Sequence, residues 1–330
     1  MKVSDILTSK NITFKNRIIM PPMATAKSDE NGHITKEILN YYEEKTSNKL
    51  FACVIVEHSF VDPRGKASKN QISIADDSDI IGLKKFADLI HNNESLAIAQ
   101  LSHAGSSTNE AIIGQRPLGP SEILNPSNQK AGMPKELSKK DIENLVEKFV
   151  HAAIRAKEAG FDGIEIHSAH GYLLNQFLSP LTNKRKDEYG GDIYGRINIH
   201  LEIIKKIREE LGQSFPIFLR LGAGDNREDG LSIDDAVKAA KEFEIAGVDI
   251  LDISGGMCLF KVDDQRPGFF DNLSKPVFDS VAIPVILTGG VKTGKDIEDI
   301  LQRNVCDLVG VGRFIFKGSS WMDKEARAYL

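Results

Sequence analysis

Short apolar segments rich in β-branched residues recur along this chain, and they restrict its possible folds more than any other feature. Near-continuous apolar runs of this length are typical of parallel strands that are buried on both faces of a sheet. Eight such segments therefore predict eight strands. They are NRIIMPPM (16–23), FACVIVEHS (51–59), SLAIAQLSH (95–103), FDGIEIHS (161–168), PIFLRLGA (216–223), VDILDISGG (248–256), IPVILTGG (283–290) and CDLVGVGR (306–313).

Helical patterns separate the predicted strands. In residues 138–160 the apolar positions recur every three or four residues, as on one face of a helix. Ser138 is the expected N-cap, Asp141 lies three residues later, and Gly160 is expected to end this helix. Further helices are predicted over residues 195–212 and 232–247, and near residues 35–48, 77–93 and 294–304.

Strands that alternate with helices predict a (β/α)8 TIM barrel, here as a single domain over residues 1–330. Barrels of this kind are routinely as long as this chain, and no Pro- or Ser-rich linker divides it. The competing fold is a doubly wound sheet, whose first strand is usually followed by a G-x-G-x-x-G turn. Because the segment NRIIMPPMATAKS contains no such turn, the barrel is favoured.

The composition argues against several classes of function. A net charge of -5 does not favour nucleic acid or an anionic membrane as a partner. No apolar run approaches the ~18 residues that span a bilayer, and no secretory signal is expected at the N-terminus. Cys53, Cys258 and Cys306 are far apart, so neither a zinc site nor an iron–sulfur cluster is expected. Free cysteines without a signal peptide are typical of a reducing cytoplasm, which is the expected location.

Two of the connections between strands and helices are long. Residues 104–137 follow the third predicted strand, and residues 171–195 follow the fourth. Both leave the carboxyl end of a strand, where barrel enzymes carry their active sites. Long loops in a compact domain are usually functional or disordered, so these two mark the candidate site.

The segment IEIHSAHGYLLNQFLSP (164–180) places polar groups at this end of the fourth strand. Because side chains alternate along a strand, Glu165 and His167 are expected to point into the barrel, with His170 and Tyr172 in the loop above. Two imidazoles can donate hydrogen bonds to an oxygen, and a phenol can deliver a proton. The pattern alone leaves two other readings open: histidines that only fill the core, and a metal site, for which the number of nearby ligands is low.

Polar groups near other strand ends are expected at the same mouth. Gln100 lies near the end of the third strand, Arg220 inside the fifth and Ser254 near the end of the sixth. A buried arginine is costly unless it meets an anion or a carboxylate. Glu165, on the adjacent strand, is one candidate partner, and an electron-rich ligand over the barrel is the other.

The last two strands end in TGGV (288–291) and GVGR (310–313). Glycines at these ends allow backbone N–H groups to approach a phosphate, which many barrels bind after their last two strands. Arg313 adds a side chain suited to a charge-assisted hydrogen bond. Together the two motifs favour a phosphate-bearing ligand.

Several of these motifs resemble the Old Yellow Enzyme family of flavin-dependent ene-reductases. The resemblance covers residues 3–317 and is most specific in GFDGIEIHSAHGYLLNQFLSPLTNKRKDEYGG (160–191), with support from NRIIMPPM, AQLSHAG, LTGGV and GVGR. It implies a TIM barrel that holds FMN noncovalently at its carboxyl-terminal mouth. It further implies that NADPH or NADH reduces FMN, which then passes a hydride to the activated C=C of an α,β-unsaturated carbonyl or nitro compound.

The resemblance also implies roles for individual residues. His167 and His170 are similar to the pair that holds the activating oxygen of the substrate, and Tyr172 to the proton donor. The positions that resemble cofactor-binding ones are Pro22, Met23, Ala24, His58, Gln100, Arg220, Ser254, Gly289, Gly290, Gly312 and Arg313. No resident metal is implied.

This sequence departs from the family pattern at a few positions. Relatives usually carry a cysteine or threonine at Ala24, many bacterial relatives have a tyrosine at Ala26, and an arginine is common at Ser106. These departures affect the expected flavin potential and the substrate range. The resemblance makes a homo-oligomer the default assembly, and a small enone or similar acceptor is the expected substrate.

The residues leave three other functions open. A dienoyl-CoA-reductase-like flavoprotein would use an iron–sulfur cluster and a second flavin domain, and the sequence provides neither cysteine ligands nor residues beyond the barrel. A flavin-free TIM-barrel lyase or aldolase would be supported by a Schiff-base lysine, but none of the predicted strands ends in lysine. An FMN-binding protein without catalysis is the third.

Overall fold

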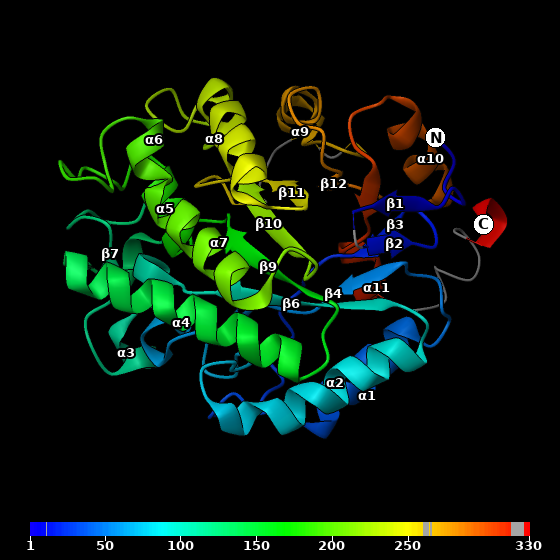
Figure 1. The fold of residues 1–330 in the computed structure, drawn as a ribbon, viewed down its shortest axis with the longest axis horizontal. Coiled ribbons are helices and arrows are strands. Elements are labelled where there is room, and N and C mark those ends of the chain that lie inside the picture. The colour runs from blue at the N-terminus through cyan, green and yellow to red at the C-terminus, as the bar shows by residue number, and fades with distance from the viewer. Residues whose placement is uncertain (11, 260–263, 265, 318–326) are drawn as a thin grey trace.

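The computed structural model describes residues 1–10, 12–259, 264, 266–317 and 327–330. The other residues of the predicted domain lie outside this description. Parallel strands form a closed barrel with helices around it (Figure 1). The barrel strands are β3 (Ile18–Met20), β4 (Cys53–Ile55), β6 (Leu96–Ser102), β9 (Gly163–Ser168), β10 (Ile217–Gly222), β11 (Ile250–Ser254), β12 (Val285–Thr288) and β13 (Leu308–Gly310).

The pairing order confirms the predicted barrel. The strands follow one another as β4-β3-β13-β12-β11-β10-β9-β6, and β4 also pairs with β6, which closes the ring. Each barrel strand lies within one of the segments predicted from the sequence. A short strand, β5 (Ser59–Phe60), extends the pairing beside β6, and a hairpin of β1 (Leu7–Ser9) and β2 (Ile12–Phe14) lies outside the ring.

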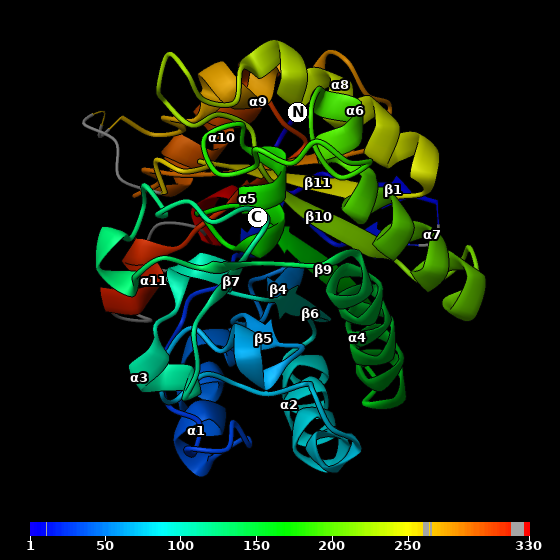
Figure 2. The same cartoon turned by 90° about the vertical axis from the view of Figure 1, so that its left-hand side faces the viewer.

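Helices pack on the outside of the barrel, as the views in Figures 1 and 2 show. All the predicted helices are present, although the one predicted over residues 195–212 is split at Ile197 into two helices. The long helices are α1 (Lys36–Thr46), α2 (Ile80–Asn92), α4 (Lys139–Glu158), α7 (Asn198–Leu211), α8 (Ile233–Ala246) and α10 (Gly294–Gln302). Shorter ones are α3 (Glu110–Ile113), α5 (Leu173–Leu178), α6 (Ile193–Arg196), α9 (Asp271–Phe278) and α11 (Arg313–Lys317).

The predicted start of α4 is confirmed in detail. Ser138 Oγ accepts a hydrogen bond from the Asp141 N–H at 3.1 Å, and Asp141 accepts one from the Ser138 N–H at 3.1 Å. This reciprocal capping box satisfies two backbone donors that the helix itself leaves unpaired. At the other end Gly160 adopts φ +86°, which ends the helix as predicted.

The barrel interior is apolar in its lower layers and polar above them. Ile98, Phe218, Ile250 and Ile286 belong to one buried cluster inside the ring, together with Phe14 from β2. The outward-facing residues of the strands, among them Ile164 and Ile166, pack instead with the helices. Glu165 and His167 therefore point inward, as the strand alternation predicted. The polar groups at the mouth therefore lie above an apolar interior.

The long connections carry regular structure of their own. Residues 104–137 contain α3 and the paired strands β7 (Leu118–Gly119) and β8 (Lys135–Glu136), and residues 171–195 contain α5 and part of α6. Among the described residues, no helix combines the length and apolar character needed to cross a membrane.

Candidate active site

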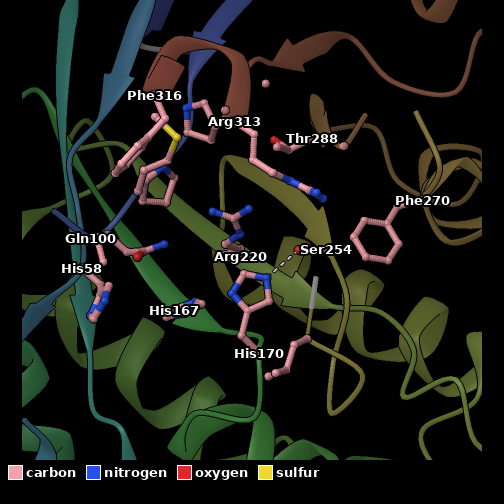
Figure 3. A pocket seen from close by; sticks show the side chains of 18 of the residues that line it. His58, Gln100, His167, His170, Arg220, Ser254, Phe270, Thr288, Arg313 and Phe316 are labelled. Atoms are coloured by element: carbon pink, nitrogen blue, oxygen red, sulfur yellow. Dashed lines mark hydrogen bonds between the residues drawn. The ribbon is translucent and has the colours of Figure 1, made fainter. Parts of the chain in front are cut away.

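A cavity of about 790 Å³ opens at the carboxyl ends of the barrel strands (Figure 3). The residues that the sequence suggested for catalysis or cofactor binding all line this one cavity. They are Pro22, Met23, Ala24, His58, Gln100, His167, His170, Tyr172, Arg220, Ser254, Gly289, Gly290, Gly312 and Arg313. The barrel brings them together because its parallel strands all end at the same rim.

His167, His170 and Tyr172 form a cluster at one side of the cavity. The ring centroids lie 5.2 Å apart for the two histidines and 5.0 Å apart for His167 and Tyr172, both in edge-to-face arrangements. His58 completes the cluster, with its ring 5.5 Å from that of Tyr172. The two histidines and the tyrosine thus face a common space, in which both imidazoles and the phenol can reach one ligand.

The turn that carries His170 and Tyr172 is held by hydrogen bonds to the carbonyl oxygen of Gly171. This oxygen accepts from Ser107 Oγ at 2.5 Å, from Asn125 Nδ2 at 3.0 Å and from Gln176 Nε2 at 2.7 Å. Two of these donors come from the connection after β6, so that long loop fixes the turn after β9. Gly171 itself has φ +70°, a conformation that favours glycine.

The imidazoles of the cluster are neutral in this environment. Burial lowers the pKa of His58 to about 4 and holds the pKa values of His167 and His170 well below the usual range, and each of the latter two pKa values is lowered further by Arg220. His170 Nε2 lies 2.7 Å from Ser254 Oγ, the contact drawn in Figure 3. A neutral imidazole donates from one nitrogen only, so each ring offers a single directed N–H.

Hydrogen bonds around His58 assign its tautomer. Gln71 Oε1 accepts from the Ala67 N–H at 2.6 Å, which orients the Gln71 amide so that its nitrogen donates to His58 Nδ1 at 2.5 Å. Since Nδ1 accepts, the proton of the neutral ring is on Nε2. His58 therefore presents a fixed donor beside Tyr172.

Tyr172 keeps its proton at neutral pH. Burial raises the pKa of its phenol to about 12, because the charged phenolate would be poorly solvated. Within the part of the chain that the structure describes, no residue hydrogen-bonds to its hydroxyl. The hydroxyl is thus a protonated donor without a competing protein acceptor in these ranges.

The floor of the cavity corrects one expectation about Arg220. Its ion-pair partner is Asp252, with Nε 3.4 Å from Oδ2, rather than Glu165. Glu165 instead accepts a hydrogen bond from Gln100 Nε2 at 2.5 Å. The sequence did not single out Asp252, although the alternation along β11 places it on the inner face, two residues before Ser254.

The ends of β12 and β13 form the opposite side of the cavity. Gly289 and Gly290 have φ +154° and +68°, so both positions favour glycine. Arg313 lies at the start of α11, with its guanidinium carbon 6.0 Å from the ring centroid of Phe269. Backbone N–H groups and a guanidinium at one end of a cavity suit a phosphate. Among the described residues, no group of three or more metal-binding side chains is present.

Sequence reasoning missed several residues that line the cavity. Phe269 and Phe270 pack edge to face, with ring centroids 4.7 Å apart, in the connection after β11. Ser127, Asn128 and Lys292 lie at the rim. The Phe-Phe pair is an apolar signal in an otherwise polar loop, but the polar rim residues have no pattern that separates them from ordinary loop residues.

Comparison with known proteins yields consistent matches. A model of the NADH:flavin oxidoreductase / NADH oxidase family matches residues 6–328. An NADH oxidase of Thermoanaerobacter brockii is 36% identical over 321 residues, which cover 95% of this chain and 49% of that protein. The chain thus spans about half the length of this curated relative.

Solved structures share the fold. A 2-naphthoyl-CoA reductase matches with a TM-score of 0.89 at 24% identity, over 94% of this chain and 50% of that one. An old yellow enzyme homologue from Zymomonas mobilis gives 0.82 at 23% identity, over 95% of this chain and 89% of that one. Morphinone reductase gives 0.81 at 24% identity, over 95% and 87% of the two chains. The predicted resemblance is confirmed, and the chain belongs to the NADH:flavin oxidoreductase / NADH oxidase family.

Proposed function

We propose that this protein is an ene-reductase that binds FMN noncovalently and uses NADPH or NADH to reduce an alkene conjugated to a carbonyl or nitro group. The observation that carries the proposal is the convergence of His167, His170 and Tyr172 on one space in the cavity. Family membership supports a flavin as the redox group. The acceptor and the role of Tyr172 are part of the proposal.

The polar groups of the cavity fit FMN at two places. On the floor, Arg220 contacts Asp252 through Nε, which leaves its terminal nitrogens as donors for a ligand, and Gln100 lines the same cavity. These two would hold the pyrimidine edge of a flavin, which presents alternating carbonyl and N–H groups. At the other end Gly290 and Arg313 would hold the phosphate. Pro22 and Met23 line the wall between, where an apolar ring system would lie. When bound, FMN supplies hydride transfer between the nicotinamide and the alkene.

The residues of the chain supply binding, charge stabilisation and the proton. In this proposal His167 and His170 would donate hydrogen bonds to the carbonyl or nitro oxygen of the acceptor, on which negative charge develops during reduction. Tyr172, whose phenol stays protonated, would protonate the alkene carbon that does not receive hydride. His167 is buried and His170 and Tyr172 are half-buried at the cavity, so a ligand bound there would displace water and strengthen these interactions.

Enoyl and dienoyl thioesters of coenzyme A are a second class of acceptor. The observation in their favour is that this chain matches half of a 2-naphthoyl-CoA reductase, with a TM-score of 0.89. A thioester carbonyl would meet the same two histidines. The lyase or aldolase alternative is disfavoured, because Lys292 at the rim is exposed and the desolvation that activates a Schiff-base lysine is therefore small.

An anaerobic absorbance experiment tests the proposal. The purified protein, with FMN added, should show flavin bands that bleach with NADPH or NADH and return when cyclohexenone is added. Bands that return only with an enoyl-CoA would assign the thioester class. Bands that bleach and never return would reject alkene reduction, and the absence of bound flavin would reject the proposal as a whole.

A pair of glycine variants tests the end of the cavity that is proposed to hold the phosphate of FMN. At Gly290, with φ +68°, an alanine Cβ would clash with the Arg266 carbonyl, whereas at Gly312 it would meet Met23 and Pro21 at an ordinary 3.5 Å. Gly290→Ala is therefore expected to lose stability by about 1–2 kcal/mol, the usual cost of a left-handed conformation, and to bind FMN more weakly. Gly312→Ala should retain the wild-type melting temperature. Thermal unfolding and FMN titration measure both effects, and equal stability of the two variants would contradict the strain at Gly290.

A further inference from the structure

Four side chains form a continuous polar layer on the floor of the cavity. They are Gln100 on β6, Glu165 on β9, Arg220 on β10 and Asp252 on β11, and each is at most 5% exposed. The strand register makes them neighbours, because Gln100 pairs with Glu165, and Arg220 pairs with both His167 and Asp252. This layer lies between the apolar interior and the groups that line the cavity.

The charges in this layer do not balance if both carboxyls are ionised. Arg220 is the cation that faces Glu165 and Asp252 among the described residues. The other titratable groups nearby are neutral: burial lowers the pKa of His167 above, and burial raises that of the Cys53 thiol below. Two carboxylates and one guanidinium would leave an excess negative charge on buried groups, which is costly.

The hydrogen bonds show where one proton would bind and so remove this excess negative charge. Glu165 Oε2 accepts from Gln100 Nε2 at 2.5 Å, whereas Glu165 Oε1 and both Asp252 oxygens are buried with no donor among the described residues. The two carboxyl groups lie within hydrogen-bonding reach of each other. A single proton between them would satisfy one oxygen of each residue.

We propose that Glu165 is protonated and donates to Asp252, so that the chain Gln100–Glu165–Asp252–Arg220 carries one negative charge opposite one positive charge. Burial and the neighbouring Asp252 raise the pKa of Glu165 well above its usual value. Burial also raises the pKa of Asp252, but Arg220 and the hydrogen bond from Glu165 oppose this change, so the charge stays on Asp252. Glu165 and Asp252 are thus positioning residues, which act on a ligand through Gln100 and Arg220.

This arrangement fixes what the floor offers to a ligand. Because the Gln100 nitrogen is bonded to Glu165, its amide oxygen remains as an acceptor for the cavity. The terminal nitrogens of Arg220 remain as donors, since the side chain contacts Asp252 through Nε. The floor thus offers one acceptor, the Gln100 oxygen, and one cation, Arg220. This pair is complementary to a ligand in which an N–H group lies beside a carbonyl that gains negative charge. This step rests on the proposed function. It identifies the imide edge of the flavin as the ligand group that Gln100 and Arg220 would bind.

Infrared spectroscopy tests the proton without any cofactor. The purified protein at neutral pH should show a carboxylic-acid C=O stretching band that is lost in Glu165→Gln. The matched control is Glu57→Gln. Burial raises the pKa of Glu57 as well, but its two oxygens accept hydrogen bonds from the N–H and hydroxyl of Thr25, at 2.8 and 2.6 Å, and these bonds favour the carboxylate. The control should leave the band intact. Failure to find an acid band that depends on Glu165 would overturn the proposal, whether or not FMN binds.

The ratio of affinities for reduced and oxidised FMN tests the charge. Glu165→Gln should keep this ratio within about threefold of wild type, because a glutamine side chain is neutral like a protonated glutamate. The double variant Glu165→Gln/Asp252→Asn removes the negative charge beside Arg220 and should favour reduced FMN by about tenfold or more, which is about 30 mV for a two-electron couple. A tenfold change in Glu165→Gln alone would show that Glu165 is ionised and would refute the proposal. If the wild-type protein did not bind FMN, that result would instead count against the proposed function.

Discussion

Replacing Tyr172 with phenylalanine is expected to slow the reduction of cyclohexenone by about 10²–10⁴-fold, the usual contribution of a positioned acid or base. The reason is that the alkene needs a proton as well as a hydride, and the Tyr172 hydroxyl is the protonated group next to the two histidines. Reduction of the flavin by NADPH or NADH requires no proton from tyrosine and should keep its wild-type rate. Stopped-flow measurement of the two half-reactions separates these effects.

The pH dependence gives a second check on Tyr172. Because its pKa is raised to about 12, the phenol stays protonated through the neutral range, and the wild-type rate of alkene reduction should not fall there through loss of this proton. The control variant is Tyr194→Phe, since Tyr194 is 53% exposed on α6 and does not line the cavity. Equal slowing of both half-reactions in Tyr172→Phe would exclude the tyrosine as the proton donor.

Removing either histidine is expected to weaken the binding of phenolic ligands by about 10–100-fold, because a hydrogen bond to a charged oxygen contributes about 1.5–3 kcal/mol. Such ligands would place a negative oxygen between His167 and His170, where an acceptor oxygen would lie during reduction. The variants His167→Ala and His170→Ala should therefore also lose enone reduction. Titration of the FMN-loaded protein with a phenol, followed through the flavin absorbance, measures the affinity.

The control for the two histidines is His151→Ala, because His151 is exposed on α4, away from the cavity. Its affinity for phenols should equal that of wild type. Unchanged affinity in both His167→Ala and His170→Ala would contradict their assignment to the substrate oxygen. A loss in only one variant would assign the oxygen to that histidine alone.

The barrel was predictable because its signals are local and repeated. Each strand buries both faces, so it is apolar along its length, and each long helix shows a periodic apolar face. The helix α9 was missed because it is short and contains Pro276, which argues against a helix when the sequence is read alone. The break at Ile197 was missed because the apolar period continues through it, and only the tertiary packing shows two helices there.

The cavity residues that lie on strands were predictable, because the strand fixes their position. The cavity residues that lie on loops were less predictable. Gln100, His167 and Arg220 follow from the inward side of a strand. The pairing of Arg220 with Asp252 rather than Glu165 depends on side-chain reach across the barrel, which the alternation of residues does not encode. Phe269, Phe270 and the rim residues depend on how loops fold over the mouth, and loop conformation is weakly specified by local sequence.

The three donors that meet the Gly171 carbonyl also bear on how this protein can be altered. Of the groups proposed for chemistry, His170 and Tyr172 lie in the turn after β9, and Ser107, Asn125 and Gln176 anchor that turn. Phe270 belongs to the connection after β11 and borders the same cavity, whereas Ser127 and Asn128 hydrogen-bond to the anchor residues Asn125 and Ser107, at 2.8 and 2.9 Å. Variation of Phe270 can therefore alter substrate preference while the anchored turn is inherited unchanged. A library for directed evolution should randomise Phe270 and leave the anchor intact, together with Ser127 and Asn128.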